Sequence, residues 1–269
     1  FIFCYGLAHY GAASFGGMCS AASVDHDGTD GDLLKNLTNN DADCFVYDSG
    51  TAKCDVSDTD YRLKWIDIEF LGATSSGNSN DQYVVIYNDD DNDKIEVIAA
   101  QLDYHIGPAP RSSTFPSSET QNLNNDDQGF QTIDLAYDDT NNKFVAVWTE
   151  GDVVYRVGSV DSSEVITLGS EGQVAGTSGN RYASVEYADT TVSGAQGQKG
   201  FAFIWEDTAH DGQVRFGQLD GTSITWSSKE EFSSSTIQRM GLTYDSNAGW
   251  FVIVYKDHSS GNSGGYARS

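Results

Sequence analysis

The sequence predicts an all-β protein built from repeated sheets, and three observations indicate this. A phrase of five apolar residues recurs four times, at residues 83–87 (YVVIY), 144–148 (FVAVW), 201–205 (FAFIW) and 251–255 (FVIVY). The aromatic residues that end these phrases are spaced 61, 57 and 50 residues apart. No helical periodicity interrupts the series. Four antiparallel strands per repeat at this period are typical of β-propeller blades, so we expect a propeller of four recognisable four-stranded blades, with room for a degenerate fifth.

Each phrase is predicted to be the second strand of its blade. A short apolar run bracketed by aromatic residues favours a strand that is buried on both faces. First strands are expected upstream, ending at Phe70, Tyr137, Tyr187 and Tyr244. Third strands are expected at 95–102, 153–160 and 214–219, and fourth strands at 165–168 and 224–226. An acid follows each phrase, and we interpret these acids as turn or cap residues: Asp89, Glu150, Asp207 and Asp257.

The chain divides into an N-terminal segment, residues 1–60, which lacks the repeat, and the propeller repeats, residues 61–269. Between the first and second repeats, residues 107–128 are polar and hold all three prolines, so we predict a loop there. The last repeat is short. After its phrase, residues 264–269 suffice for little more than a third strand and leave no fourth.

The amino-acid composition limits the classes of partner that the protein can bind. The chain carries 40 Asp and Glu against 15 Lys and Arg, a net charge of −25. Such a charge repels phosphate backbones and anionic lipid surfaces, so we expect no nucleic-acid partner and no membrane partner. No apolar run is long enough to insert into a bilayer.

The N-terminal segment predicts an extracellular, secreted or cell-surface protein. All four cysteines lie there, and two disulfides are expected among Cys4, Cys19, Cys44 and Cys54, with the local pairs 4–19 and 44–54 needing the shortest loops. Asn36 begins the sequence's glycosylation motif. The first residue is Phe1 rather than Met, which fits signal cleavage or a chain that begins at the first residue determined.

The chain opens with an apolar stretch that we predict to be an assembly strand, carried by Phe1, Ile2, Phe3 and Tyr5. An incomplete last blade leaves backbone groups unpaired, and a strand from the other end of the chain can pair with them. Two interpretations stay open. The strand closes its own ring, or it pairs with a neighbouring molecule and builds a head-to-tail polymer.

Two acidic loops are candidate calcium sites. Asp89, Asp91 and Asp93 are spaced two apart, so that one loop can turn several carboxylates onto a hard cation. Asp25, Asp27 and Asp30 form a second acidic, glycine-rich loop, which continues to Asp32. The alternative in each case is a solvated turn without an ion.

The repeat unit at residues 135–148 (LAYDDTNNKFVAVW) resembles repeats of extracellular and surface-displayed β-propeller proteins. Residues 220–226 (DGTSITW) also resemble the Asp-box turn of sialidase-like propellers, whose pattern is Ser-x-Asp-x-Gly-x-Thr-Trp, although its Ser and its spacing are not matched. The first resemblance covers roughly residues 61–269 and implies the propeller architecture, which hosts enzymes, lectins and scaffolds alike. The second implies a glycan-active protein.

We therefore expect an extracellular structural or adhesive protein without enzymatic activity, a self-assembling filament or surface-coat subunit. The alternative is a carbohydrate-binding or glycoside-hydrolysing propeller with a glycan partner. Acids are too numerous for spacing alone to nominate a catalytic pair, and no motif for a nucleophilic serine is present. A hydrolase requires two carboxylates facing each other at the central pocket. A filament subunit requires an open groove that matches its own terminus.

Overall fold

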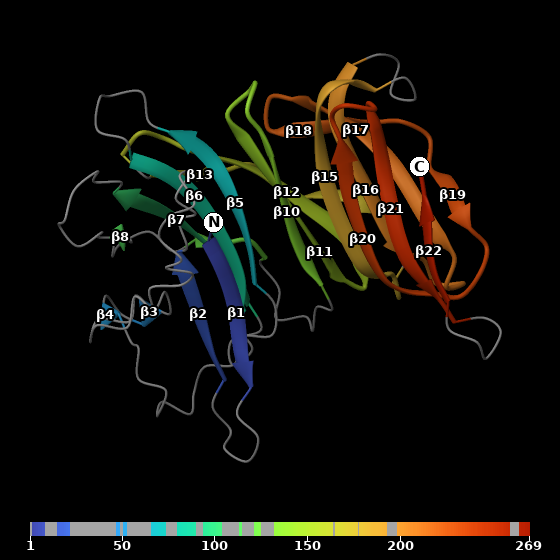
Figure 1. Cartoon of the computed structure of the whole chain (residues 1–269), viewed down its shortest axis with the longest axis horizontal. Helices are drawn as coiled ribbons and strands as arrows, with labels where there is room; N and C mark the ends of the chain where they lie inside the picture. The colour runs from blue at the N-terminus through green and yellow to red at the C-terminus, as the bar shows by residue number, and fades with distance from the viewer. Residues whose placement is uncertain are drawn as a thin grey trace, which may run out of the picture.

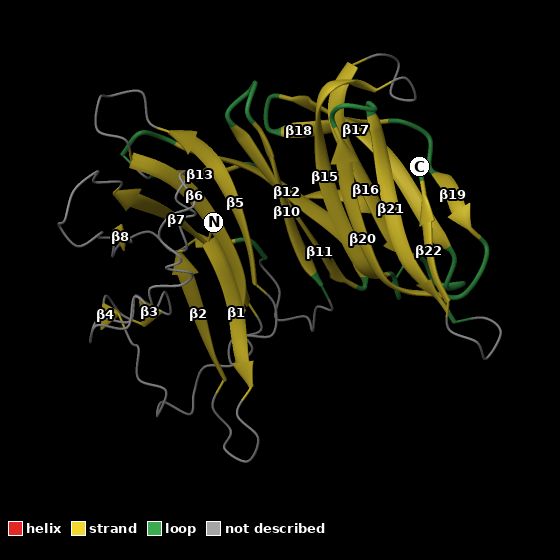
Figure 2. Ribbon diagram, viewed as in Figure 1, coloured by secondary structure: helices red, strands yellow, loops and turns green. Residues whose placement is uncertain are grey.

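A computed structural model describes residues 2–8, 15–21, 47–48, 51–52, 66–73, 80–89, 94–103, 113–114, 121–124, 132–163, 165–176, 178–192, 198–258 and 264–269. Its regular elements in these ranges are all β-strands (Figure 2). The predicted all-β class is confirmed. In the same ranges, no helix has the length and hydrophobicity that crossing a membrane requires.

Four antiparallel repeat sheets follow one another along the chain, and two hairpins precede them (Figure 1). Sheet 1 comprises β5 (Ile66–Ala73), β6 (Asn80–Asp89), β7 (Lys94–Asp103), β8 (Ser113–Thr114) and β9 (Gln121–Asn122). Sheet 2 comprises β10 (Ile133–Asp138), β11 (Lys143–Glu150), β12 (Asp152–Val160), β13 (Ile166–Leu168) and β14 (Gly172–Ala175). Sheet 3 comprises β15 (Arg181–Val192), β16 (Gln198–Glu206), β17 (Gly212–Asp220), β18 (Ser223–Trp226) and β19 (Glu230–Ser233). Sheet 4 comprises β20 (Ile237–Asp245), β21 (Trp250–Asp257) and β22 (Gly264–Arg268). The hairpins are β1 (Ile2–Ala8) with β2 (Phe15–Ala21), and β3 (Tyr47–Asp48) with β4 (Thr51–Ala52).

The four sheets fan out from their first strands in a propeller-like arrangement. Within each sheet the first three strands lie side by side in chain order, with the first strand at one edge. The first strands β5, β10, β15 and β20 contact one another in that order, and we call them the inner strands. In Figure 1 the fan runs from sheet 1 in teal to sheet 4 in red.

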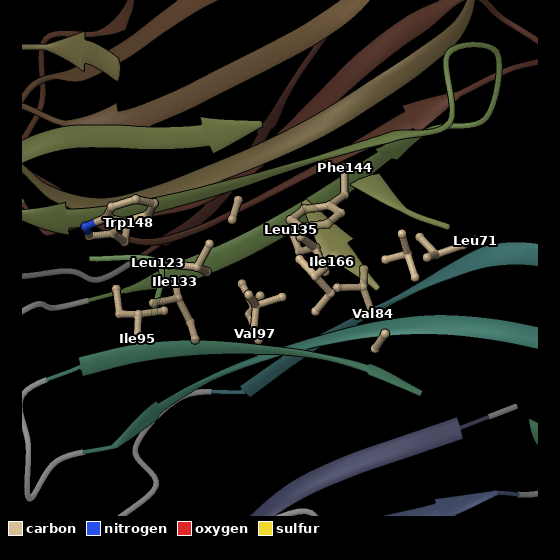
Figure 3. Packing of buried hydrophobic residues seen from close by; sticks show 14 of the residues in the cluster. Leu71, Val84, Ile95, Val97, Leu123, Ile133, Leu135, Phe144, Trp148 and Ile166 are labelled. Atoms are coloured by element: carbon tan, nitrogen blue, oxygen red, sulfur yellow. The ribbon is translucent and has the colours of Figure 1, made fainter. Parts of the chain in front are cut away.

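The repeated phrases form the second strands, as predicted, and the phrases of sheets 1 to 3 bury both faces. In sheet 4 the prediction fails on one face, because Val254 of β21 is exposed. Side chains alternate across a strand, so Phe144, Ala146 and Trp148 of β11 pack backward against sheet 1 (Figure 3). Val145 and Val147 pack forward against sheet 3. The same alternation joins sheet 3 to sheet 4. Each sheet therefore has a backward face, toward the preceding sheet, and a forward face, toward the next.

Acids and residues with positive φ form the turns between first and second strands. Asp138 accepts hydrogen bonds from the backbone N–H groups of Thr140 (3.0 Å) and Asn141 (3.1 Å). Asp245 accepts two equivalent bonds from the backbone of the β20–β21 turn. Asn142 (φ 52°) and Gly249 (φ 70°) adopt the left-handed conformation, which short side chains and glycine tolerate best. An aspartate and a residue with positive φ therefore form both turns.

The structure corrects two predictions. The fourth strand of sheets 1 to 3 is split into two short strands that pair with different parts of the third strand. In sheet 1 these are β8 and β9, which lie inside the stretch 107–128 that we predicted to be loop throughout. The sequence signal for β8 and β9 is weak because each strand is two residues long. Beside them, the backbone N–H of Leu123 donates a hydrogen bond to the carbonyl of Ile95 (2.7 Å).

The second correction concerns one interpretation of the apolar N-terminal strand, namely that it closes the ring of its own chain. Within the single chain β1 pairs with β2, from Ile2 opposite Ala21 to Ala8 opposite Phe15, and it neighbours β5. It does not pair with the last sheet, whose strand β22 pairs with β21. A hairpin partner close in sequence costs less loop entropy than the far end of the chain.

Candidate active site on the inner strands

The inner strands carry acids at matching positions of an otherwise apolar pattern. We count back from the aromatic residue near the end of the strand, which is Phe70, Tyr137 or Tyr187. The third residue before it is Asp67, Asp134 or Ser184, and the residue just before it is Glu69, Ala136 or Glu186. These two positions lie on one face of each strand, because side chains alternate. Ser184 and the four acids are half-buried, so each keeps some contact with solvent.

Asp134 is held in place by the neighbouring sheet. Its Oδ2 accepts a hydrogen bond from the backbone N–H of Val185 (2.9 Å) and another from the hydroxyl of Ser184. Both donors belong to β15. Two donors on one oxygen therefore hold the Asp134 side chain in a fixed orientation.

Asp67 faces Asp134 from the preceding inner strand. Burial raises the pKa of Asp67 to about 9, and the negative charge of Asp134 and the hydrogen bond between the two side chains act in the same direction. One hydrogen bond opposes this shift, the one that Asp67 accepts from the N–H of Ile68 (2.9 Å). At neutral pH Asp67 is therefore protonated, and one proton lies between two carboxyl groups.

A second pair of acids is formed by Glu69, two residues after Asp67 on β5, and Glu186 on β15. Burial raises the pKa of Glu69 to about 7, and the charge of Glu186 adds to this effect. Burial also raises the pKa of Glu186 to about 7, partly offset by the hydrogen bond from the N–H of Tyr187 (3.3 Å). Both glutamates thus exchange protons near neutrality, where proton transfer is most efficient.

The cluster brings together a proton donor and groups that accept protons at the same pH. Carboxyl groups whose pKa values are pushed apart by their surroundings are the usual basis for separate acid and base roles. Perturbed pKa values of this kind gather at functional sites. In the part of the chain with described side chains, no set of three or more His, Cys, Asp or Glu residues has a geometry suited to a metal ion.

The residues nominated from sequence lie elsewhere. Asp89 is the last residue of β6 and pairs with Lys94 across the β6–β7 hairpin, while Asp91 and Asp93 lie outside the described residues. Outside them, too, are the other loop acids, the glycosylation asparagine, two cysteines and the first residue: Asp25, Asp27, Asp30, Asn36, Cys44, Cys54 and Phe1. Ile2, Phe3 and Tyr5 lie in β1, and its register places Cys4 opposite Cys19 on β2.

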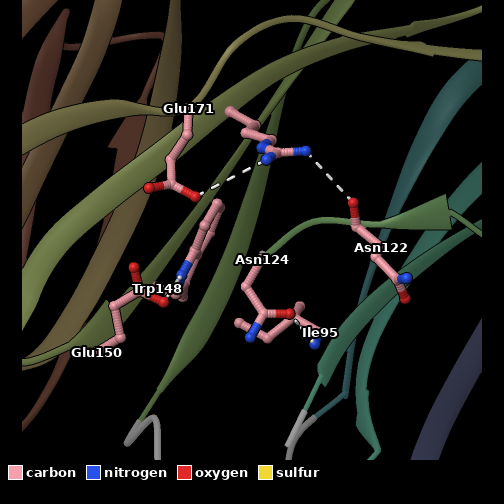
Figure 4. Close-up of polar contacts among 7 residues, drawn as sticks. Ile95, Asn122, Asn124, Trp148, Glu150 and Glu171 are labelled. Atoms are coloured by element: carbon pink, nitrogen blue, oxygen red, sulfur yellow. Dashed lines mark hydrogen bonds and ion pairs between the residues drawn. The ribbon is translucent and has the colours of Figure 1, made fainter. Parts of the chain in front are cut away.

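Among the acids that follow the phrases, Asp207 has the predicted turn role. Asp207 accepts hydrogen bonds from the N–H groups of Ala209 (2.9 Å) and Asp211 (3.1 Å). Glu150 differs, because its Oε2 accepts the indole N–H of Trp148 (3.1 Å) (Figure 4).

Sequence reasoning missed the inner-strand acids. The signal was present, since Glu69 and Glu186 each precede the aromatic residue of a first strand, and Asp67 and Asp134 each stand three places before it. A charged residue that recurs at one position of apolar strands is unusual, because burying a charge is costly. Their meeting across sheets, however, depends on how the inner strands pack.

Comparison with known proteins gives a distant likeness only. No protein-family model matches the chain, and no curated protein matches it. Among solved structures, it is similar to NanB solved with Optactamide and to the K499G mutant of NanB sialidase from Streptococcus pneumoniae, each with a TM-score of 0.48 and 12% identity. These matches cover 72% of this chain and 27% and 28% of those chains, so this chain spans about a quarter of their length.

Proposed function

We propose that the inner-strand acids form an acid–base site for a neutral, hydroxyl-rich ligand of the glycan class, with cleavage of a glycosidic bond as the reaction. The observation that carries the proposal is the Asp67–Asp134 pair, in which burial and a neighbouring charge raise the pKa of Asp67 to about 9 beside a carboxylate fixed by Ser184. Glycoside hydrolysis requires one protonated and one ionised carboxyl group at the same pH.

Each acid has a role that its surroundings support. Protonated Asp67 donates its proton to the oxygen of the leaving group, and the Asp134 carboxylate stabilises the positive charge that develops on the sugar ring. The ionised member of the Glu69–Glu186 pair takes a proton from the attacking water. The acids and the net charge of −25 repel anionic ligands, so neutral sugars are favoured over phosphorylated or carboxylated ones.

A panel of neutral aryl glycosides tests this proposal. Hydrolysis should rise with pH through about 7, where the glutamates ionise, and fall through about 9, where Asp67 loses its proton. Asp67→Asn should abolish turnover while glycan binding persists, and Asp189→Asn, an exposed acid on β15, serves as the control. Absence of both hydrolysis and glycan binding, or full activity of Asp67→Asn, would contradict the proposal.

Self-assembly is the second candidate function, and the open edge of sheet 4 favours it. Within the described ranges, sheets 1 to 3 have five strands each, whereas sheet 4 has three and ends at β22. An unpaired edge strand is a template for another strand. We also propose the extracellular location, the disulfides, the calcium loops and glycosylation at Asn36 on the sequence patterns described above.

A further inference from the structure

The three interfaces between successive sheets are built in the same way, but the interface between sheets 3 and 4 contains a cavity. Between sheets 2 and 3, the fourth-strand residue Ile224 fills the outer part of the core, and its N–H donates to the hydroxyl of Tyr155 (3.1 Å). Ile166 of β13 occupies the corresponding place between sheets 1 and 2. Sheet 4 has no described fourth strand, and a cavity of about 450 Å³ lies between sheets 3 and 4.

Six apolar residues in the wall of the cavity match residues that surround Ile224. By strand register, these six are Ala202, Val214, Phe216, Leu242, Phe251 and Ile253. Phe232, Trp250 and the polar residues Glu230, Glu231 and Arg268 also line the cavity. The counterparts of the six matching residues one sheet earlier are Val145, Tyr155, Val157, Val185, Phe201 and Phe203, which all pack in one cluster with Ile224. The cavity is therefore the place where a fourth strand of sheet 4 would insert an apolar side chain.

A repeated arginine shows that the rest of this interface is intact. Arg156 on the third strand of sheet 2 donates to the carbonyl of Asn122 in sheet 1 (3.3 Å) and lies 3.8 Å from Glu171 (Figure 4). Arg215 donates in the same way to Val174 in sheet 2 (2.7 Å). Arg268 of β22 donates to the carbonyl of Phe232 in sheet 3. Sheet 4 therefore packs against sheet 3 in the same way as sheets 2 and 3 pack against the sheets before them. Sheet 4 differs in having no described strand after β22.

Apolar side chains are exposed on the same sheet. Trp250 is 58% exposed, Val254 49% and Tyr266 50%. The forward-face valines Val145 and Val147 of sheet 2 are fully buried by sheet 3. Val254 occupies the position in sheet 4 that Val147 occupies in sheet 2, so the described part of the chain leaves the forward face of sheet 4 open at this residue.

We infer that β22 accepts β1 of a second copy of this chain, an inference that rests on the second proposed function, self-assembly. β1 pairs with β2 along one edge and has no other strand partner in the described topology. Its other edge can pair with β22, so that the hairpin extends sheet 4 by two strands. Alternate residues of β1 include Phe3, Tyr5 and Leu7, a set with the apolar bulk that the cavity requires.

A second copy fits better than closure within one chain. In Figure 1, β1 lies beside sheet 1, at the opposite end of the fan from β22, and it contacts β5. If β1 keeps this position and pairs with β22 of a neighbouring molecule, sheet 1 of one molecule is joined to sheet 4 of the next. Contacts between different surfaces of identical chains give head-to-tail assemblies. The net charge of −25 opposes association at low salt, so assembly should strengthen as salt screens the repulsion.

Complementation between two variants of the 269-residue chain tests the inference. The first variant lacks residues 1–8 and so lacks the donated strand. The second carries proline in β22, as Tyr266→Pro or Ala267→Pro. Consecutive N–H groups of a strand point to opposite edges, so one of these prolines removes a donor on the free edge and the other breaks the pairing with β21. The variant that keeps the wild-type melting temperature is the edge variant, and the other is its control.

Molar mass is measured by light scattering during gel filtration at about 1 M salt, where the Debye length is about 3 Å. The wild type should form oligomers whose mass grows with concentration. Each variant alone should be monomeric, and their equimolar mixture should stop at about twice the monomer mass, because each dimer then has neither a free donor nor a free acceptor. A mixture that stays monomeric, or oligomers that persist in either variant, overturns the inference while self-assembly stands. A monomeric wild type overturns both.

Discussion

Replacing Asp67 by Asn should remove a large pH dependence from the stability of the fold. In the folded protein burial raises the pKa of Asp67 from 3.8 to about 9, with the Asp134 charge adding to the shift. Below about pH 4 the side chain is protonated in both the folded and the unfolded chain. As pH rises toward 9 the unfolded chain ionises Asp67 and the folded chain does not, so the free energy of unfolding falls through this window.

The full shift corresponds to about 7 kcal/mol at 1.36 kcal/mol per pKa unit. Solvent reaches this half-buried site and screens part of it, so we expect Asp67→Asn to gain about 2 to 4 kcal/mol over the wild type between pH 4 and 9. Asn imitates the protonated acid, because its amide can donate to Asp134.

Urea unfolding at intervals between pH 4 and 9 measures the difference, and the other acids cancel between the two proteins. The matched control is Asp189→Asn, an exposed side chain on β15. If the stability curves of Asp67→Asn and the wild type run parallel over this range, the reasoning about a shared proton is refuted.

Three further predictions concern the scaffold. Arg215→Gln should destabilise the fold by about 1 to 3 kcal/mol in urea unfolding. The substitution removes the hydrogen bond to the Val174 carbonyl and the contact with the Trp226 ring, whose centroid lies 4.9 Å from the guanidinium carbon. An unchanged unfolding midpoint would show that these two contacts of Arg215 are not needed for stability. Gly158→Ala should cost about 1 to 3 kcal/mol by the same measurement, since a Cβ there would lie 2.2 Å from the Phe144 ring; a stability equal to wild type would mean that the ring moves freely. Cys4 and Cys19, which lie opposite each other on β1 and β2, should resist alkylation without reductant in mass spectrometry, and labelling of either would exclude their disulfide.

The fold could be predicted largely because the phrase that ends at Trp148 recurs three more times in the sequence, which makes the repeat easy to recognise. Aromatic and β-branched residues in short runs favour strands, and Asp138 and Gly249 indicate the turns between them. The segments β8 and β9 escaped prediction because strands of two residues have no periodicity to detect. Their pairing with β7 depends on tertiary contacts.

The candidate site could not be predicted from spacing. Asp67 and Asp134 are 67 residues apart in the sequence, and nothing local distinguishes them among 40 acidic residues. What distinguishes them is that β5, β10 and β15 pack side by side, which places Asp134 between Asp67 and the donors on β15. Nor does the sequence show that Arg156 and Arg215, at equivalent positions of their third strands, bind carbonyl groups of the preceding sheet.

The most direct test of the shared proton is a titration of the aspartate carboxyl carbons by NMR, with Asp67→Asn used to assign the Asp67 signal. We predict that Asp67 titrates near pH 9 in the wild type, and that Asp134→Asn lowers this value by removing the neighbouring charge and the bond to it. An Asp67 carboxyl that titrates near its ordinary value of 3.8 would contradict the account, because Asp67 would then share no proton with Asp134 at neutral pH.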